Sequence, residues 1–354
     1  MAKRIKTLLG QVASFALAGG LLYLALRDVD FGEVAAALAS ANYWWLIPLA
    51  TLTIVSHLLR SWRWQILLYE LPGAQRDRPV SLYNAFSALI VGYFANYAAP
   101  RVGELVRAGL LARNERLSVS GVVGTVVLER VLDIVVLILC VGITFVMLLD
   151  RFEVISELLL DPLLVWWAGV PLYALVAGAV AALVAGTVVV SFWRRSLRAS
   201  GKGSRLRGLV DSFIAGMATL SRTRRTGAVV IGTILMWACY VVMTHLPFLV
   251  LGMTGPFNLT LVDSFYIMTL GAIGVAIPAP GGTGSYHYIA IQSLVLLFGV
   301  SQSPAATYAV LTHAAQLVLY AALATYFIAS QKASIGEIRK LEHDAEAAIR
   351  QPPG

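Results

Sequence analysis

Six ionisable side chains interrupt two otherwise apolar stretches of the chain: Arg101, Glu104, Arg107, Glu129, Arg130 and Asp133. Spacings of three and four residues place each group on one face of a helix. An ionisable group at bilayer depth costs roughly 2.5–3.5 kcal/mol on insertion scales, so it needs a partner or a wet cavity. The six residues therefore form either a cavity whose guanidinium groups bind a phosphate, or structural ion pairs such as Arg101–Glu129 and Arg130–Glu104.

A glycine-rich turn at 278–287 is the second candidate site. Gly281, Gly282 and Gly284 in this turn let backbone N–H groups approach a ligand closely. A helix that begins near Ser285 would direct the positive end of its dipole at an anion. His287 is interpreted either as a proton carrier or as a histidine with satisfied hydrogen bonds.

Three more histidines and one basic segment also lie in apolar surroundings. His57, His245 and His313 are spaced singly, and no role is assigned to them. Arg60 and Arg63 belong to the sequence Arg-Ser-Trp-Arg-Trp, which closes an apolar run. This basic and aromatic composition is typical of an anchor at the membrane interface, with contacts to lipid headgroups as the alternative.

The sequence contains no motif for other chemistry. Patterns of the type His-Glu-x-x-His, Gly-x-Ser-x-Gly and Walker A are absent. We therefore expect no metal, no cofactor and no catalytic residue. Cys140 and Cys239 lie inside apolar runs and indicate no disulfide framework.

The composition defines the class of protein. Of the 354 residues, 58% are hydrophobic and 13% are charged, whereas a soluble domain is about 45–50% apolar and about 25% charged. These values exclude an ordinary soluble enzyme, a disordered chain and a disulfide scaffold, and they indicate an all-α polytopic membrane protein. The net charge of +8 is interpreted as marking the cytoplasmic face and its anionic lipids rather than as a nucleic-acid site.

Apolar runs predict six full transmembrane helices, at 8–26, 44–68, 118–149, 163–192, 226–252 and 304–331. The first follows Lys3, Arg4 and Lys6, as in a signal peptide. It is followed by no small-residue cleavage site, so we predict an uncleaved span. A short interfacial helix is expected at 31–41.

Two further apolar pieces, 81–112 and 264–300, are each broken near the middle by a Pro-x-x-Gly sequence, at Pro100–Gly103 and Pro278–Gly281. The arms of the second piece correspond to about 20 and 24 Å of helix, which is less than a hydrocarbon core of about 30 Å. We therefore predict two re-entrant helical hairpins, the first with a long arm that ends just before Pro100. The hairpins enter from opposite sides, which indicates an inverted repeat with a site at its centre.

The distribution of basic residues orients this topology. Most of the 27 lysines and arginines fall on the side of the N-terminus, and this side is cytoplasmic by the positive-inside rule. Both termini, the basic loop at 193–226 and the polar tail at 332–354 are therefore predicted to lie in the cytoplasm of a bacterial or archaeal cell. Residues 1–331 are expected to form a single transmembrane domain in the inner membrane.

Four short sequences carry a resemblance to a known family: Arg60-x-x-Arg63-Trp64, Pro100-Arg101-x-Gly103-Glu104-x-x-Arg107, Glu129-Arg130-x-x-Asp133 and Pro280-Gly281-Gly282-Thr283-Gly284. Over nearly the whole chain, their order resembles the flippase-like membrane domain family, which includes the transmembrane part of lysylphosphatidylglycerol synthases. The resemblance implies transfer of polar-headed lipids between leaflets and re-entrant helices around a central cavity. The soluble aminoacyl-transferase domain is absent, so lipid aminoacylation is not expected. His287 stands where many relatives carry Glu, which leaves headgroup choice and ion coupling open.

These features predict a lipid translocase for an anionic or zwitterionic polar-headed lipid, either a glycerophospholipid or a polyprenyl-phosphate carrier, with proton or cation coupling. The three arginines of the first group would meet the phosphate, and its three carboxylates would orient them. One alternative is a membrane-embedded enzyme or accessory subunit of lipid-linked glycan or phospholipid metabolism. A second is an ion-coupled transporter of a small solute.

Overall fold

The computed structural model describes residues 2–72, 74, 80–149, 204–277 and 279–330. Every regular element in these ranges is a helix, which confirms the all-α prediction for this part of the chain. The predicted span at 163–192 and the predicted tail at 332–354 lie outside the described residues.

The first half of the chain forms a unit of two long helices around two short ones. The long helices are α3 (Leu46–Leu68) and α6 (Val119–Met147), and the short ones are α4 (Leu82–Ala95) and α5 (Val102–Glu115). The two short helices pack against each other as a hairpin. The first arm of this hairpin was predicted to extend to just before Pro100. This prediction is wrong, because α4 already ends at Ala95.

The early end of α4 has a local cause. The Oδ1 atom of Asn96 accepts a hydrogen bond of 2.8 Å from the backbone N–H of Gly103, which closes the turn between the arms. Residues that precede a proline disfavour the helical conformation, so the segment before Pro100 does not extend α4. A Cβ atom on Gly103 would lie 1.9 Å from the carbonyl oxygen of Gly92. The close contact between α4 and α5 therefore requires glycine at this position.

The second half of the chain repeats this order of elements. The long helices are α12 (Thr226–Val250) and α15 (Gln302–Ser330), and the short ones are α13 (Leu261–Ala276) and α14 (Ser285–Phe298). A 3-10 turn at Pro280–Gly282 lies between the short helices. The predicted start of a helix near Ser285 is confirmed.

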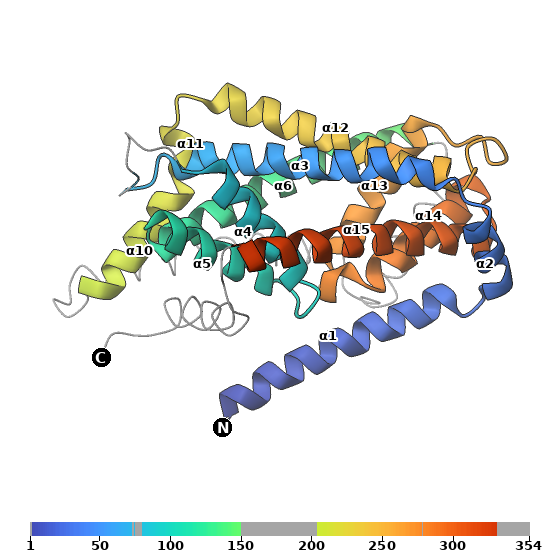
Figure 1. The fold of residues 1–354 in the computed structure, drawn as a ribbon, viewed down its shortest axis with the longest axis horizontal. Helices are drawn as coiled ribbons and strands as arrows, with labels where there is room; N and C mark the ends of the chain where they lie inside the picture. Colours follow the sequence, from blue (N-terminus) through green and yellow to red (C-terminus); the bar gives the residue numbers. More distant parts are fainter. Residues whose placement is uncertain (1, 73, 75–79, 150–203, 278, 331–354) are drawn as a thin grey trace.

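The two hairpins lie at opposite ends of the long helices and extend toward each other (Figure 1). The break of one hairpin lies next to the break of the other. Helices α3 and α15 run in one direction, while α6 and α12 run in the other (Figure 1). The N–H of Gly281 donates a hydrogen bond of 2.9 Å to the carbonyl oxygen of Asn96, so one break contacts the other directly. Helix α15 packs on both α4 and α14. The hairpins therefore have opposite orientations around a common centre.

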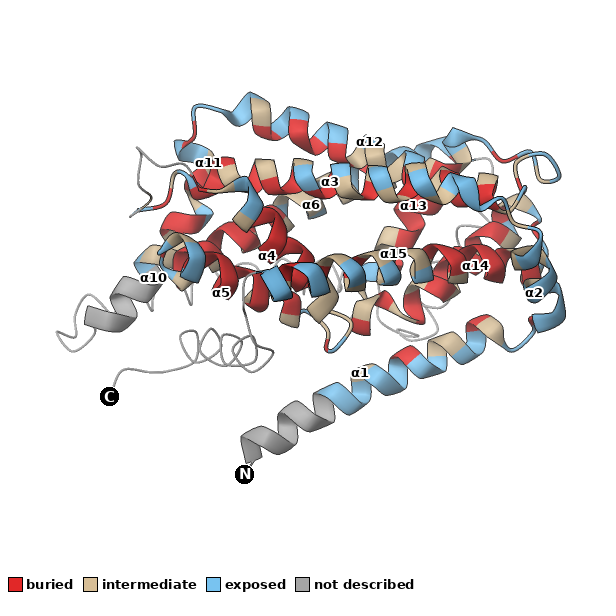
Figure 2. Ribbon diagram, viewed as in Figure 1, coloured by how far each residue is buried: buried red, intermediate tan, exposed pale blue. Residues whose placement is uncertain are grey.

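Two helices precede this arrangement. Helix α1 (Ala2–Leu26) packs against α14, and most of its residues from 11 to 26 are exposed (Figure 2). Helix α2 (Phe31–Ala39) begins after Asp30, whose Oδ1 accepts a 2.7 Å hydrogen bond from the N–H of Gly32. Segments 11–26 and 31–39 are bent by 83° relative to each other. The first predicted span and the predicted short helix correspond to α1 and α2.

The segment at 193–226, predicted as a basic loop, contains two helices in its described part. Helix α10 (Ser204–Met217) packs on α6, and α11 (Thr219–Arg222) follows it. A Cβ atom on Gly124 of α6 would lie 2.2 Å from the carbonyl oxygen of Phe213. Small residues on α6 thus let α10 approach closely, a contact that basic composition alone does not reveal.

Two described helices, α12 and α15, are long and apolar enough to cross a membrane by length and composition alone. A third span results if the bent pair of α1 and α2 is counted as one. Figure 2 shows the hairpin helices α4, α5 and α14 as the most buried part of the described chain. Apolar clusters surround each hairpin, one including Leu111 and Ile90, the other including Ile291 and Leu294.

Candidate functional site

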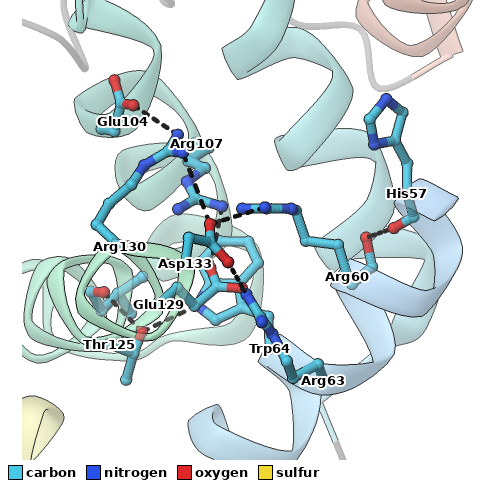
Figure 3. A network of polar contacts seen from close by, with 12 residues as sticks. His57, Arg60, Arg63, Trp64, Glu104, Arg107, Thr125, Glu129, Arg130 and Asp133 are labelled. Atoms are coloured by element: carbon cyan, nitrogen blue, oxygen red, sulfur yellow. Dashed lines mark hydrogen bonds and ion pairs between the residues drawn. The ribbon is translucent and has the colours of Figure 1, made fainter. Parts of the chain in front are cut away.

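Glu129 of α6 is the centre of a buried network of ion pairs (Figure 3). Its Oε1 atom lies 3.3 Å from Nη2 of Arg63 on α3, and its Oε2 atom lies 3.1 Å from Nη1 of Arg107 on α5. Glu129 and Arg63 are fully buried, and Arg107 is 2% exposed. One carboxylate therefore joins three helices at a depth that water does not reach in this conformation.

Asp133, one turn further along α6, extends the network to a second arginine of α3. Nη2 of Arg60 donates to its Oδ2 atom at 2.7 Å, and Nη2 of Arg63 donates to its Oδ1 atom at 3.0 Å. Nη1 of Arg130 lies 3.8 Å from the same Oδ2 atom. Asp133 thus brings three guanidinium groups together.

Arg130 and Glu104 form the more accessible edge of the network. Nη2 of Arg130 donates to Oε1 of Glu104 at 2.7 Å, and the two side chains are 38% and 22% exposed. This confirms the predicted Arg130–Glu104 pair, which joins α6 to the first hairpin. The network therefore has an accessible side at this pair and a closed side at Glu129.

Uncharged groups hold the arginines in place. The indole Nε1 of Trp64 donates to Oγ1 of Thr125 at 2.9 Å, and Cζ of Arg107 lies 4.9 Å from the centre of the Trp64 ring. A guanidinium group over an indole face gains a cation–π interaction. Nη1 of Arg63 donates to Oγ1 of Thr233 at 3.0 Å, which connects the network to α12.

Positive charge exceeds negative charge in this network, which contains four arginines and three carboxylates: Arg60, Arg63, Arg107, Arg130, Glu104, Glu129 and Asp133. Within the described part of the chain, none of the three guanidinium nitrogens of Arg107 has a hydrogen-bond partner, so its contact with Glu129 is an ion pair by distance only. Buried donors without partners are costly. Arg107 therefore offers a set of donors that an anion would satisfy.

The predicted roles of Arg60 and Arg63 as interface anchors are wrong. These side chains are 5% and 0% exposed, because their shared face on α3 turns toward the carboxylates of α6. Their spacing of three residues, the same as that of Arg101, Glu104 and Arg107, was the sequence signal for this face. The flanking tryptophans favoured the interface reading instead.

Arg101 lies outside the network, so the predicted Arg101–Glu129 pair is wrong. Its backbone has a φ of 63°, in the left-handed region, and it directly precedes α5. A continuous helix from this residue, which would align it with Glu104, therefore does not form. The side chain is exposed, and its Nη2 donates to the carbonyl oxygen of Ala276 at 3.5 Å. Arg101 thus connects the first break to the end of α13.

The absence of a side chain at Gly281 and Gly284 allows other parts of the chain to approach the second break closely. A Cβ atom on Gly281 would lie 2.5 Å from the ring of Tyr97, and one on Gly284 would lie 2.1 Å from the carbonyl oxygen of Ala18 on α1. The N–H groups of Gly281, Gly282 and Gly284 all have partners within the chain. The expected backbone donors for a ligand are therefore occupied in this conformation.

The histidines of the described helices are not isolated, in contrast to the sequence interpretation. The rings of His287 and His313 have centroids 4.8 Å apart. Nε2 of His57 lies 2.9 Å from the hydroxyl of Tyr320, and the ring of Tyr93 lies beside both. These three histidines lie on separate helices, so sequence spacing carries no signal for these contacts. No group of three or more potential metal ligands occurs in the described residues.

The apolar helices and the buried ion-pair network define an integral membrane protein with a polar site inside its helical bundle. The family described as the transmembrane region of lysylphosphatidylglycerol synthase matches residues 11–324. The chain belongs to this family, as the resemblance predicted, and the family indicates a function related to membrane lipids. The comparisons with curated proteins and with solved structures give no match.

Proposed function

We propose that the protein is a lipid translocase that moves an anionic or zwitterionic polar-headed lipid between leaflets. The headgroup passes through the network and the meeting point of the hairpin breaks, while the acyl or prenyl tails stay in the lipid. The observation that carries this proposal is the guanidinium group of Arg107, which is buried and without a hydrogen bond within the described residues. A phosphate supplies the acceptors that this group lacks.

Exposure along the network supports a route for the headgroup. Arg101 is exposed at the contact between the breaks. Arg130 and Glu104 are partly exposed, whereas Arg107 and Glu129 are buried. A headgroup that first meets Arg101 and Arg130 would exchange one arginine contact for the next as it moves inward. Arginine suits this task because its planar fork binds phosphate with two parallel hydrogen bonds.

The carboxylates act as internal substitutes for the phosphate. In this conformation Glu129 holds Arg63 and Arg107, so the site is closed. A bound phosphate takes over the donors of Arg107, and Glu129 keeps Arg63. The surplus of one positive charge among the seven residues makes the network receptive to one negative charge.

The two units with opposite directions support alternating access. We infer that they form an inverted repeat, that the two hairpins are re-entrant, and that their breaks meet near the middle of the membrane. In inverted repeats, transport follows from rocking one repeat against the other around a fixed site. The side with most basic residues would then be cytoplasmic, and the membrane would be the inner membrane of a prokaryotic cell.

A leaflet-asymmetry assay tests whether the protein translocates lipid. Purified protein is reconstituted into vesicles that contain a fluorescently labelled phospholipid, and a membrane-impermeant reductant quenches the outer leaflet. We expect quenching to proceed beyond the outer-leaflet fraction in protein-containing vesicles and to stop there in protein-free vesicles. Quenching that stops at the same level in both would contradict the proposal. Chemical turnover of the headgroup without translocation would favour an enzyme, and flux of a small solute would favour a solute transporter.

A further inference from the structure

His287 and His313 face each other across the contact between α14 and α15. Their ring centroids are 4.8 Å apart, and the ring planes are inclined by 52°. His287 is 5% exposed, and His313 is partly buried. Neither residue belongs to the ion-pair network. Two imidazoles this close form a site whose charge changes with pH.

Both rings contact the same glycine-rich turn. The N–H of Gly284 donates to Nδ1 of His287 at 3.4 Å. A backbone N–H only donates, so this nitrogen carries no proton and the His287 ring is neutral here. Nε2 of His313 lies 3.3 Å from the hydroxyl of Thr283. The two histidines therefore connect the turn to α14 on one side and to α15 on the other.

The surroundings of the pair contain no compensating charge within the described residues. Its titratable neighbours are the tyrosines Tyr286 of α14, Tyr97 of the first break and Tyr308 of α15, which lies beside Tyr286. From α1, the atoms nearest to the turn belong to Ala18 and Leu22. Among the described residues, no carboxylate forms an ion pair with either histidine. An added proton would therefore leave an uncompensated positive charge.

We propose that His287 and His313 form a proton-binding site whose occupation releases the glycine-rich turn. The proton binds to Nδ1 of His287, where the new N–H faces the N–H of Gly284 and the hydrogen bond between them is lost. The charge lies in the first turn of α14, at the positive end of the helix dipole, and beside the second imidazole. Movement of the turn away from α14 separates the two N–H groups, whereas the helix dipole and the second imidazole remain and weaken proton binding.

The released turn is connected to the ion-pair network. Gly281 in the turn is hydrogen-bonded to Asn96 in the first break, and the ring of Tyr97 lies 5.5 Å from that of His313. The same break leads through Arg101 into α5, which carries Glu104 and Arg107. Proton binding thus loosens the contact that holds the two hairpins together. Its use as a coupling step in transport rests on the proposed function, whereas proton binding itself does not.

Protonation is measured directly by nitrogen NMR of protein labelled at its histidines, in lipid nanodiscs between pH 8 and pH 4. The chain has five histidines, so variants His287→Gln and His313→Gln assign the two signals. We expect both signals to titrate, and the signal of each to shift its midpoint when the other residue is replaced. If His287 stays neutral over the whole range, or the two titrate independently, the proposal is wrong.

Release of the turn is measured by hydrogen exchange of the Gly284 amide, corrected for the intrinsic pH dependence of exchange. We expect exchange in the wild type to rise by roughly five- to tenfold as His287 is protonated, the factor that corresponds to one net hydrogen bond. His287→Gln keeps an acceptor for Gly284 but binds no proton, so its exchange should not rise. His245→Gln, which replaces a histidine bonded to Ser264 on α13, should behave as the wild type. A protonated His287 with unchanged exchange would overturn the proposal, whether or not the protein translocates lipid.

Discussion

At the scale of single residues, the network depends on Glu129, because this carboxylate contacts arginines from two other helices. Replacing Glu129 by Gln leaves Arg63 and Arg107 without that charge partner in a buried site. Removing one partner of a buried ion pair costs about 3–5 kcal/mol. We therefore expect Glu129→Gln to lower the free energy of unfolding by this amount, measured by denaturation in mild detergent.

The matched control breaks an exposed ion pair. Arg27 and Asp28 lie 3.0 Å apart with side chains 54% and 67% exposed, and an exposed pair contributes at most about 1 kcal/mol. Arg27→Gln should therefore change stability by less than this. Equal effects of Arg27→Gln and Glu129→Gln would show that the network does not stabilise the fold.

The sequence predicted the charged residues of α5 and α6 as a site, but it assigned Arg60 and Arg63 of α3 to the membrane interface or to lipid headgroups. Glu104, Arg107, Glu129 and the residues near it were recognisable because charge inside an apolar run needs a partner. Arg60 lies near the end of such a run, where an interface anchor is equally reasonable. Only the packing of α3 on α6 and α4, which involves residues far apart in the chain, distinguishes the two readings.

At the scale of helices, the first hairpin depends on the glycine contact between α4 and α5. A Cβ atom on Gly103 would lie 1.9 Å from the carbonyl oxygen of Gly92. The clash is with backbone, so the helices must separate, and overpacking of this kind costs about 1–3 kcal/mol or more. Gly103→Ala should therefore destabilise the protein in thermal unfolding, with a loss of translocation.

Gly142 on α6 provides the control for this substitution. No described residue lies within 4 Å of a Cβ atom at this position, and alanine favours a helix over glycine by up to about 1 kcal/mol. Gly142→Ala should therefore leave stability unchanged or slightly raise it. A Gly103→Ala variant as stable as Gly142→Ala would contradict the packing of the hairpin.

The contact between the two breaks leads to a separate prediction about thermal stability. Gly281 has a φ of 58°, and a Cβ atom there would lie 2.5 Å from the ring of Tyr97. Gly252 has a similar φ of 65°, and no described residue lies within 4 Å of a Cβ atom there. Both Gly→Ala changes place alanine in the left-handed region, at a cost of roughly 1–2 kcal/mol. We expect Gly281→Ala to reduce thermal stability more than Gly252→Ala does.

The additional loss of thermal stability in Gly281→Ala, relative to Gly252→Ala, measures the contact with Tyr97. Adding Tyr97→Ala removes the clashing ring, so the double variant should lose less stability than the sum of the two single variants. A strictly additive double variant would mean that the breaks do not touch. The breaks themselves were predictable from Pro100 and Pro278, whereas their contact was not, because it joins segments far apart in the chain.

At the scale of the whole molecule, the two units bring the two hairpin breaks into contact, through the hydrogen bond between Gly281 and Asn96. The first break leads into α5, and α13 of the second hairpin packs on α6. The order of hydrophobic runs predicted this repetition of elements. The packing of α10 on α6 was not predicted, because it depends on Gly124 and its neighbours rather than on composition. A movement of one unit against the other would change the hydrogen bond between Arg63 and Thr233, which connects the network to α12.

Arg101 gives the cleanest test of the site, because its side chain is exposed and outside the network. Asn tolerates the left-handed backbone of this position, so Arg101→Asn should fold as the wild type. The decisive measurement is the rate of phospholipid translocation in vesicles for the wild type, Arg101→Asn and the control Arg27→Asn. We expect a loss of roughly tenfold or more for Arg101→Asn, as for one charge-assisted hydrogen bond, with Arg27→Asn unchanged. Equal rates for all three proteins would contradict it.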